Sequence, residues 1–96
     1  MNEKELIVGR VYDIPIHSNV IKSIPCVYIG KKKYYSNSLT RHIVALRSLI
    51  TGETEINTFT RFSMRGNLLV MKHVRRPDLS DSEKQYLEER LGVAGL

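Results

Sequence analysis

The stretch RHIVALRSLITGETEINTFT, residues 41–60, decides the fold class of this chain. Its second half, residues 53–60, is rich in threonine and alternates between polar and apolar side chains. Threonine, isoleucine and phenylalanine are frequent in strands, and no apolar stripe at helical spacing runs through these residues. We therefore predict a β-strand over residues 53–60.

The first half of this stretch has two interpretations. Four apolar residues recur at the spacing of a helix: Leu39, Ile43, Leu46 and Ile50. Ser38 would cap such a helix and Gly52 would end it. Alternatively, residues 41–50 form a strand that Thr51-Gly52 joins to the next strand as a two-residue turn. Because the strand at 53–60 needs an antiparallel partner nearby, we favour the hairpin.

Three further segments predict strands because they are rich in β-branched and aromatic residues: 6–16, 25–30 and 68–74. Gly30, followed by three lysines, predicts a tight reversal or a bulge that leads into Tyr34 and Tyr35. Residues 61–64 are expected to form one helical turn or a bend, and residues 65–67 a turn.

A C-terminal helix is predicted over residues 80–91. Ser80 and Glu83 match a capping box, in which each satisfies a backbone group of the other. Leu87 and Leu91 share one face, and Gly92 is a suitable C-terminal stop. We expect the two leucines to cover the open end of a barrel; a small interaction face, extended by residues 93–96, is the alternative.

Three stretches together carry a family resemblance: Val8-Gly9-Arg10-Val11-Tyr12, Leu49-Ile50-Thr51-Gly52-Glu53, and the bend with returning strand at 59–69. Over residues 6–74 the layout resembles the SH3-like small β-barrel, the group that includes Tudor and KOW modules. The resemblance implies a mainly β fold, a five-stranded barrel with a short C-terminal α-helix, in one domain spanning residues 1–96. Modules of this group bind nucleic acid, peptides or proteins, and the fold alone does not choose among these ligands.

Charge is unevenly distributed along the chain, whose net charge is +5. Residues 1–76 contain thirteen Lys/Arg and five Asp/Glu, whereas residues 77–96 contain two and five. A basic body with an acidic tail is typical of polyanion binders, because clustered cations release counterions from phosphates.

The candidate nucleic-acid-binding residues begin with a basic and aromatic run, Lys31-Lys32-Lys33-Tyr34-Tyr35. The lysines would bind phosphate and a tyrosine could stack on a base; the alternative is a solvated hairpin tip whose lysines protect an edge strand. Arg65, Arg75 and Arg76 are expected to be exposed and to extend the surface. For Arg41, Arg47 and Arg61 we favour surface ion pairs with Glu53 and Glu55.

No catalytic, cofactor or metal site is predicted. Cys26 lies in an apolar run, where a buried and inert thiol is expected. The three histidines lack the spacing of a metal pair: His17, His42 and His73. A lone cysteine and the absence of a signal-like or membrane-spanning segment favour an intracellular, cytoplasmic location away from membranes.

We therefore expect a small, non-enzymatic binding module that contacts the backbone of DNA or RNA through a Lys/Arg patch. The alternative is a protein-interaction module that docks on an acidic surface of a larger enzyme or complex. The size of the chain also resembles that of phage accessory proteins, which implies a modulator of that kind. The sequence leaves the choice of DNA or RNA, and the oligomeric state, open.

Overall fold

The computed structural model describes residues 5–17, 19–34 and 39–96, with the backbone alone for residues 33, 34 and 39. These residues form a mainly β fold, as predicted, with one sheet and one helix. The elements, in chain order, are β1 (Val11–Pro15), β2 (Ser23–Tyr34), β3 (Leu39–Arg47), β4 (Thr54–Phe59), β5 (Arg61–Arg65), β6 (Leu68–Lys72) and α1 (Asp81–Val93).

The hairpin of β3 and β4 confirms the strand interpretation of residues 41–50. The two strands pair antiparallel from His42 opposite Phe59 to Arg47 opposite Thr54. The connection, however, is the longer segment 48–53 rather than a two-residue turn. Ser48 N donates to the carbonyl of Glu53, and this bond closes a wider loop than the predicted turn.

The other strands differ from the prediction mainly in their ends. β1 begins only at Val11, because residues 7–10 form a turn in which Gly9 has a φ of 87°. β2 continues past Gly30 to Tyr34 instead of reversing, so the bulge was the correct alternative at that glycine.

The helical turn predicted at residues 61–64 is wrong, because this segment is strand β5. Its residues alternate between exposed and half-buried, and it pairs antiparallel with β6 through a turn at Gly66. The chain is too short here for a helix to bury a stripe, whereas alternation buries Phe62 and Met64 on one side. The sheet thus has six strands where five were expected.

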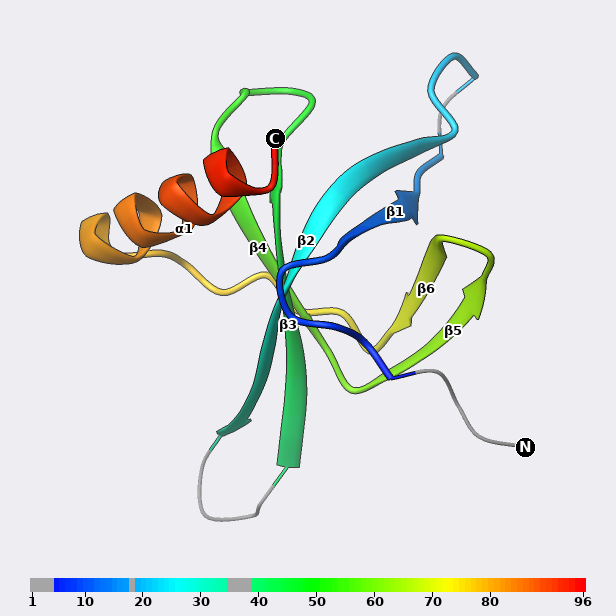
Figure 1. Ribbon diagram of the computed structural model, residues 1–96, viewed down its shortest axis with the longest axis horizontal. Helices are drawn as coiled ribbons and strands as arrows, with labels where there is room; N and C mark the ends of the chain where they lie inside the picture. Colours follow the sequence, from blue (N-terminus) through cyan, green and yellow to red (C-terminus); the bar gives the residue numbers. More distant parts are fainter. Residues whose placement is uncertain (1–4, 18, 35–38) are drawn as a thin grey trace.

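The sheet has the order β4-β3-β2-β1-β6-β5 (Figure 1). Neighbouring strands are antiparallel except β1 and β6, which run parallel where Asp13 lies opposite Leu68. A backbone bridge joins Thr58 on the β4 edge to Arg75, just beyond β6, with N–O distances of 2.8 Å in both directions. The sheet is therefore curled enough for its β4 edge to meet the chain that leaves β6.

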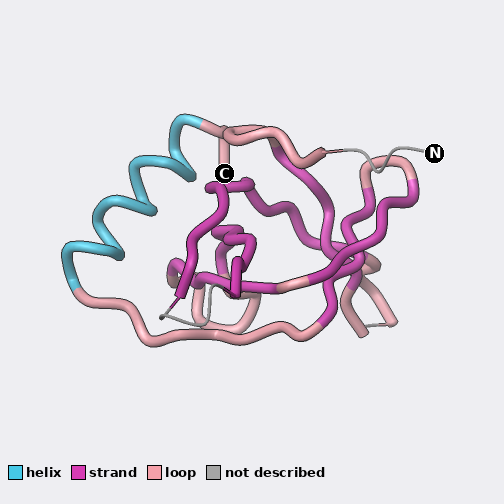
Figure 2. The backbone as a smooth tube through the Cα atoms, turned by 90° about the horizontal axis from the view of Figure 1, so that it is seen from below, coloured by secondary structure: helices cyan, strands magenta, loops and turns pink. Residues whose placement is uncertain are grey.

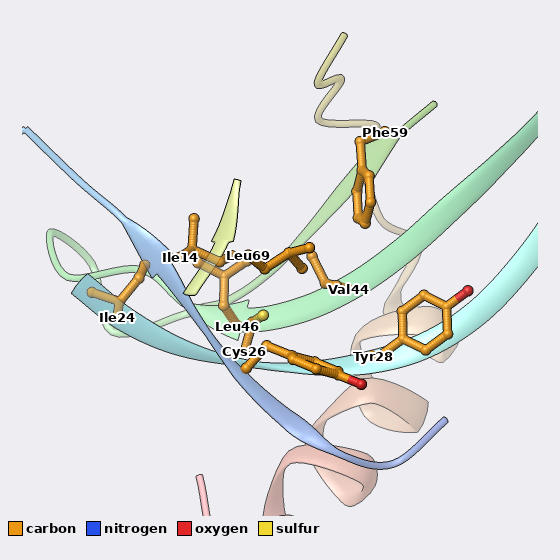
Figure 3. Close-up of a cluster of buried hydrophobic side chains, with 9 residues drawn as sticks. Ile14, Ile24, Cys26, Tyr28, Val44, Leu46, Phe59 and Leu69 are labelled. Atoms are coloured by element: carbon orange, nitrogen blue, oxygen red, sulfur yellow. The ribbon is translucent and has the colours of Figure 1, made fainter. Parts of the chain in front are cut away.

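One face of the curled sheet holds the larger apolar core (Figure 3). Its fully buried side chains include Cys26, Tyr28, Val44, Phe59 and Leu69. The expectation of a buried cysteine is confirmed, and burial raises the pKa of the Cys26 thiol to about 12, so the reactive thiolate does not form at neutral pH.

Helix α1 packs on the opposite face and lies along one side of the strands (Figure 2). Leu87 and Leu91 are buried against Val27 and Ala45, so they cover a face of the sheet rather than an open end of a barrel. Ser80 and Glu83 form the predicted capping box.

The end of α1 was predicted slightly too early. Gly92 lies inside the helix, which is capped at Ala94, and the left-handed residue after it is Gly95, with a φ of 80°. Because Gly95 rather than Gly92 has this conformation, one more residue after Gly92, Val93, belongs to the helix.

Within the described part of the chain, no helix has the length and apolar character required to cross a bilayer.

Candidate functional site

A β-bulge in β2 decides which lysine faces the interior of the curled sheet. Tyr28 lies opposite Val44, but Gly30 lies opposite Ile43, so Ile29 is an additional residue on β2. The extra residue reverses the alternation of side chains beyond it. Lys31 therefore lies opposite His42, on the same face as Tyr28.

Lys31 lines an open groove that encloses about 520 Å³. The remaining walls come from the N-terminal segment, β2, β3 and β5: Glu5, Leu6, Val8, Tyr28, Gly30, His42 and Phe62. The N-terminal wall is fixed by main-chain hydrogen bonds to β2, from Gly9 N to the Tyr28 carbonyl at 2.9 Å and from Tyr28 N to the Arg10 carbonyl at 3.1 Å. This volume lies within the range of about 300–1,000 Å³ that is typical of small-molecule sites.

The floor of the groove is an aromatic cluster centred on His42. Its imidazole stacks on Phe59, with ring centroids 5.0 Å apart, and meets Phe62 edge to face at 5.3 Å. His42 Nδ1 and the Tyr28 hydroxyl are hydrogen-bonded at 2.9 Å. Burial, and then the nearby charge of Lys31, lower the pKa of His42, so the ring is neutral at pH 7 and suits an uncharged ligand.

Next to this groove, β5 and β6 present a basic outer face. Arg61 lies directly opposite Lys72, and both are exposed; Arg65 projects from the same side of β5, four residues further on. Phe62 lines the groove, whereas its neighbour Arg61 points to the other side of the strand. No carboxylate of the described residues lies within ion-pair distance of these three cations.

The lysine and tyrosine run is thus divided by the bulge. Lys31 and Lys32 are both exposed. Lys32, however, lies opposite Arg41, on the face of the sheet that carries α1. The charge of Lys32 helps to lower the pKa of Glu83. The hairpin-tip interpretation placed the lysines in a turn, whereas all three are part of strand β2. For Lys33 and Tyr34 the backbone alone is described, and Tyr35 lies outside the described residues.

The three predicted arginines differ in their contacts within the described part of the chain. Arg65, Arg75 and Arg76 are all exposed, as expected, but Arg76 forms an ion pair with Glu55 at 3.3 Å. The main chain of Arg75 forms the bridge to Thr58.

The prediction of ion pairs with Glu53 and Glu55 is wrong for Arg41, Arg47 and Arg61, and Arg61 has no carboxylate partner among the described residues. Arg47 instead forms a two-pronged hydrogen bond with Glu88 of α1, at 2.9 and 2.8 Å. Arg41 is 5% exposed and donates to the Thr58 side chain at 2.9 Å and to the carbonyls of Thr58 and His73. Both arginines stabilise the fold. Arg47 holds α1 to the sheet, and Arg41 joins β3 to the backbone bridge between Thr58 and Arg75.

Four residues of this region were missed as a site: His42, Phe62, Arg61 and Lys72. The alternation of Arg61, Phe62, Ser63 and Met64 was a usable strand signal, but the pairing of Arg61 with Lys72 depends on the turn at Gly66. The convergence of Tyr28, His42 and Phe62 comes from three strands and has no local sequence signal.

Among the described residues, no three of His, Cys, Asp and Glu are grouped so that they could hold a metal ion. No protein family, curated protein or solved structure matches this chain.

Proposed function

We propose that this protein is a non-enzymatic module that binds the phosphate backbone of nucleic acid. The observation that carries the proposal is the pairing of Arg61 with Lys72 across β5 and β6, with no carboxylate of the described residues within ion-pair distance. Like charges directly opposite each other destabilise a sheet, so this arrangement costs folding free energy that a bound anion would offset.

The spacing of the cations also suits a chain of phosphates rather than a single ion. Arg61 and Arg65 are four residues apart on one strand face, which is about 13 Å at roughly 3.3 Å per residue. Lys31 adds a cation on the groove side of the same region. An extended polyanion can contact such a row, and each contact releases counterions.

The acidic residues of α1 support a basic surface on β5 and β6, because two of them already have partners. Glu88 is held by Arg47 and Thr54, and Glu83 by the backbone and hydroxyl of Ser80. Two of the acidic residues of α1 are therefore engaged, while Arg61 and Lys72, on strands that lie away from α1 (Figure 1), have no carboxylate partner among the described residues.

The test is a titration of the protein with fluorescent single-stranded and duplex oligonucleotides at several salt concentrations. Binding that weakens steeply with salt is expected, and a Lys31→Ala/Arg61→Ala/Lys72→Ala variant should bind much more weakly. Absence of binding at low salt, or unchanged binding by this variant, would overturn the proposal.

A second candidate is docking on an acidic surface of another protein. One observation favours it: Leu49 and Ile50 project from the β3–β4 loop and are 56% and 95% exposed. Adjacent exposed aliphatic side chains are typical of contact sites for a partner protein. Pull-down from a nuclease-treated host lysate, with Ile50→Ser as the comparison, tests this role. A partner that both proteins retain equally would show that the β3–β4 loop is not its contact site.

A further inference from the structure

Building on the proposed function, we infer that the groove beside the basic face takes one unpaired nucleobase, so that the protein selects single-stranded over duplex nucleic acid. The juxtaposition that points to this is an aromatic groove lined by Phe62, whose neighbour on the same strand is the phosphate-binding Arg61. The two side chains point to opposite faces of β5, and β5 is an edge strand of the sheet. A nucleic-acid strand that passes around this edge would place a base in the groove and a phosphate beside Arg61.

The chemistry of the groove suits an uncharged, flat ligand better than a phosphate. Two charged residues line it, Lys31 and Glu5, and in this proposal the exposed Lys31 contacts the backbone phosphate next to the bound base. The other walls are Leu6, Val8 and the aromatic side chains. Bases stack on aromatic rings regardless of sequence, because every base has a π-face.

His42 gives the groove a polar contact besides the apolar walls. Its Nδ1 is hydrogen-bonded to the Tyr28 hydroxyl, whereas no residue of the described chain is bonded to its Nε2. A half-buried imidazole with one engaged nitrogen can offer the other to the edge of a base. The groove thus offers a base both aromatic walls and a polar ring nitrogen.

Duplex nucleic acid is a poor match for this arrangement. A paired base lies inside the stack and must be unpaired before it can enter a pocket, at a cost of a few kcal/mol. A single strand bears no such cost. The outer cations would still contact a duplex, so duplex binding is expected to be weaker but not absent.

The experiment compares three probes of equal length by fluorescence anisotropy at one salt concentration: oligothymidylate, an abasic oligonucleotide, and a duplex. We expect oligothymidylate to bind at least about fivefold more tightly than the abasic strand, the lower end of what one stacked base contributes. Equal affinity for the abasic strand would overturn the base pocket and leave backbone binding intact. Binding of none of the three would instead overturn the proposed function.

A variant comparison locates the base. Phe62→Leu keeps an apolar side chain but removes the ring, and Tyr86→Leu removes an exposed ring on α1 as the matched control. Phe62→Leu should abolish the preference for oligothymidylate over the abasic strand, and Tyr86→Leu should preserve it. Circular dichroism and thermal unfolding of both variants confirm that they are folded.

Amide chemical shifts identify the occupant independently. Oligothymidylate is expected to shift the signals of Lys31, His42 and Phe62, and N-acetylphenylalanine amide is the probe for an apolar peptide side chain. If the amide signals of these three residues shift to saturation with the amino-acid probe but not with oligothymidylate, the ligand of the groove is a peptide side chain and not a base.

Discussion

Lys31 lies directly opposite His42 across β2 and β3, and Lys32 lies opposite Arg41 on the other face of the same strands. The single bulge between Tyr28 and Gly30 sets this order. Two adjacent lysines are therefore given different surroundings, one beside the aromatic groove and the other beside Glu83 of α1.

This difference predicts unequal effects of two otherwise identical substitutions. Lys31→Ala should weaken binding of a single-stranded oligonucleotide severalfold and reduce the slope of log K against log salt by about 0.7, the contribution of one phosphate contact. Lys32→Ala removes the same charge from the opposite face and should leave the slope nearly unchanged. Anisotropy titrations over a salt series measure both slopes, and equal slopes for the two variants would contradict the assigned faces.

Substitution of Arg61 is expected to stabilise the fold and to weaken oligonucleotide binding. Arg61→Thr removes the repulsion from Lys72 and introduces a residue with high strand propensity, so it should raise the free energy of unfolding by about 0.2–1 kcal/mol. The same variant should bind oligonucleotide more weakly. Urea denaturation and anisotropy provide the two values; a destabilised Arg61→Thr protein would show that the pair is not repulsive.

Arg41 is expected to be among the most sensitive charged positions. Arg41→Ala removes a buried guanidinium that donates to the Thr58 hydroxyl and to the carbonyls of Thr58 and His73, of which, among the described residues, only the Thr58 carbonyl keeps a second donor, Arg75 N. The expected cost is about 2–4 kcal/mol of unfolding free energy. Arg65→Ala, an exposed arginine on β5, is the control and should change this free energy by less than about 0.5 kcal/mol. Denaturant midpoints compare the two, and a similar small loss for both would show that the Arg41 contacts contribute little.

The His42 ring predicts a pH dependence of stability. Its pKa is lowered in the folded state, so the unfolded chain binds the proton more tightly. The contribution of His42 is complete above its ordinary pKa of about 6.5 and is lost as the pH falls from there towards the lowered pKa.

Urea unfolding between about pH 7.5 and about pH 5 measures this effect. His42→Gln should reduce the loss of stability over that interval, whereas His17→Gln, an exposed position, should retain it. An identical pH profile for His42→Gln and the unsubstituted protein would contradict the burial of the imidazole in the aromatic cluster.

Local signals predicted the elements of the fold well. Helix α1 was identified from its capping box, Ser80 and Glu83, and from its apolar pair, Leu87 and Leu91. Both signals depend only on residues close together in the sequence. Alternation and threonine content likewise identified β4. The ends of β1 and β2 were less predictable, since Gly9 and Gly30 allow a turn or a bulge with similar sequences.

The candidate site was only partly predictable, because it depends on register. Lys31 was identified from charge, but the face it occupies follows from one extra residue at Ile29. Arg41 has the same charge as Arg61, yet one is buried and the other exposed, a difference that depends on the closure of β4 on residue 75. Long-range pairing of this kind has no signature in a single sequence.

The salt dependence of single-strand binding tests the central claim most directly, that Arg61 and Lys72 hold phosphates. The Arg61→Ala/Lys72→Ala variant should reduce the slope of log K against log salt by about 1.4, the value for two lost contacts. Lys84→Ala/Arg90→Ala removes the same two charge types from α1 and should leave the slope unchanged. Equal slopes for the two double variants would show that net charge alone drives binding and would contradict a phosphate site on β5 and β6.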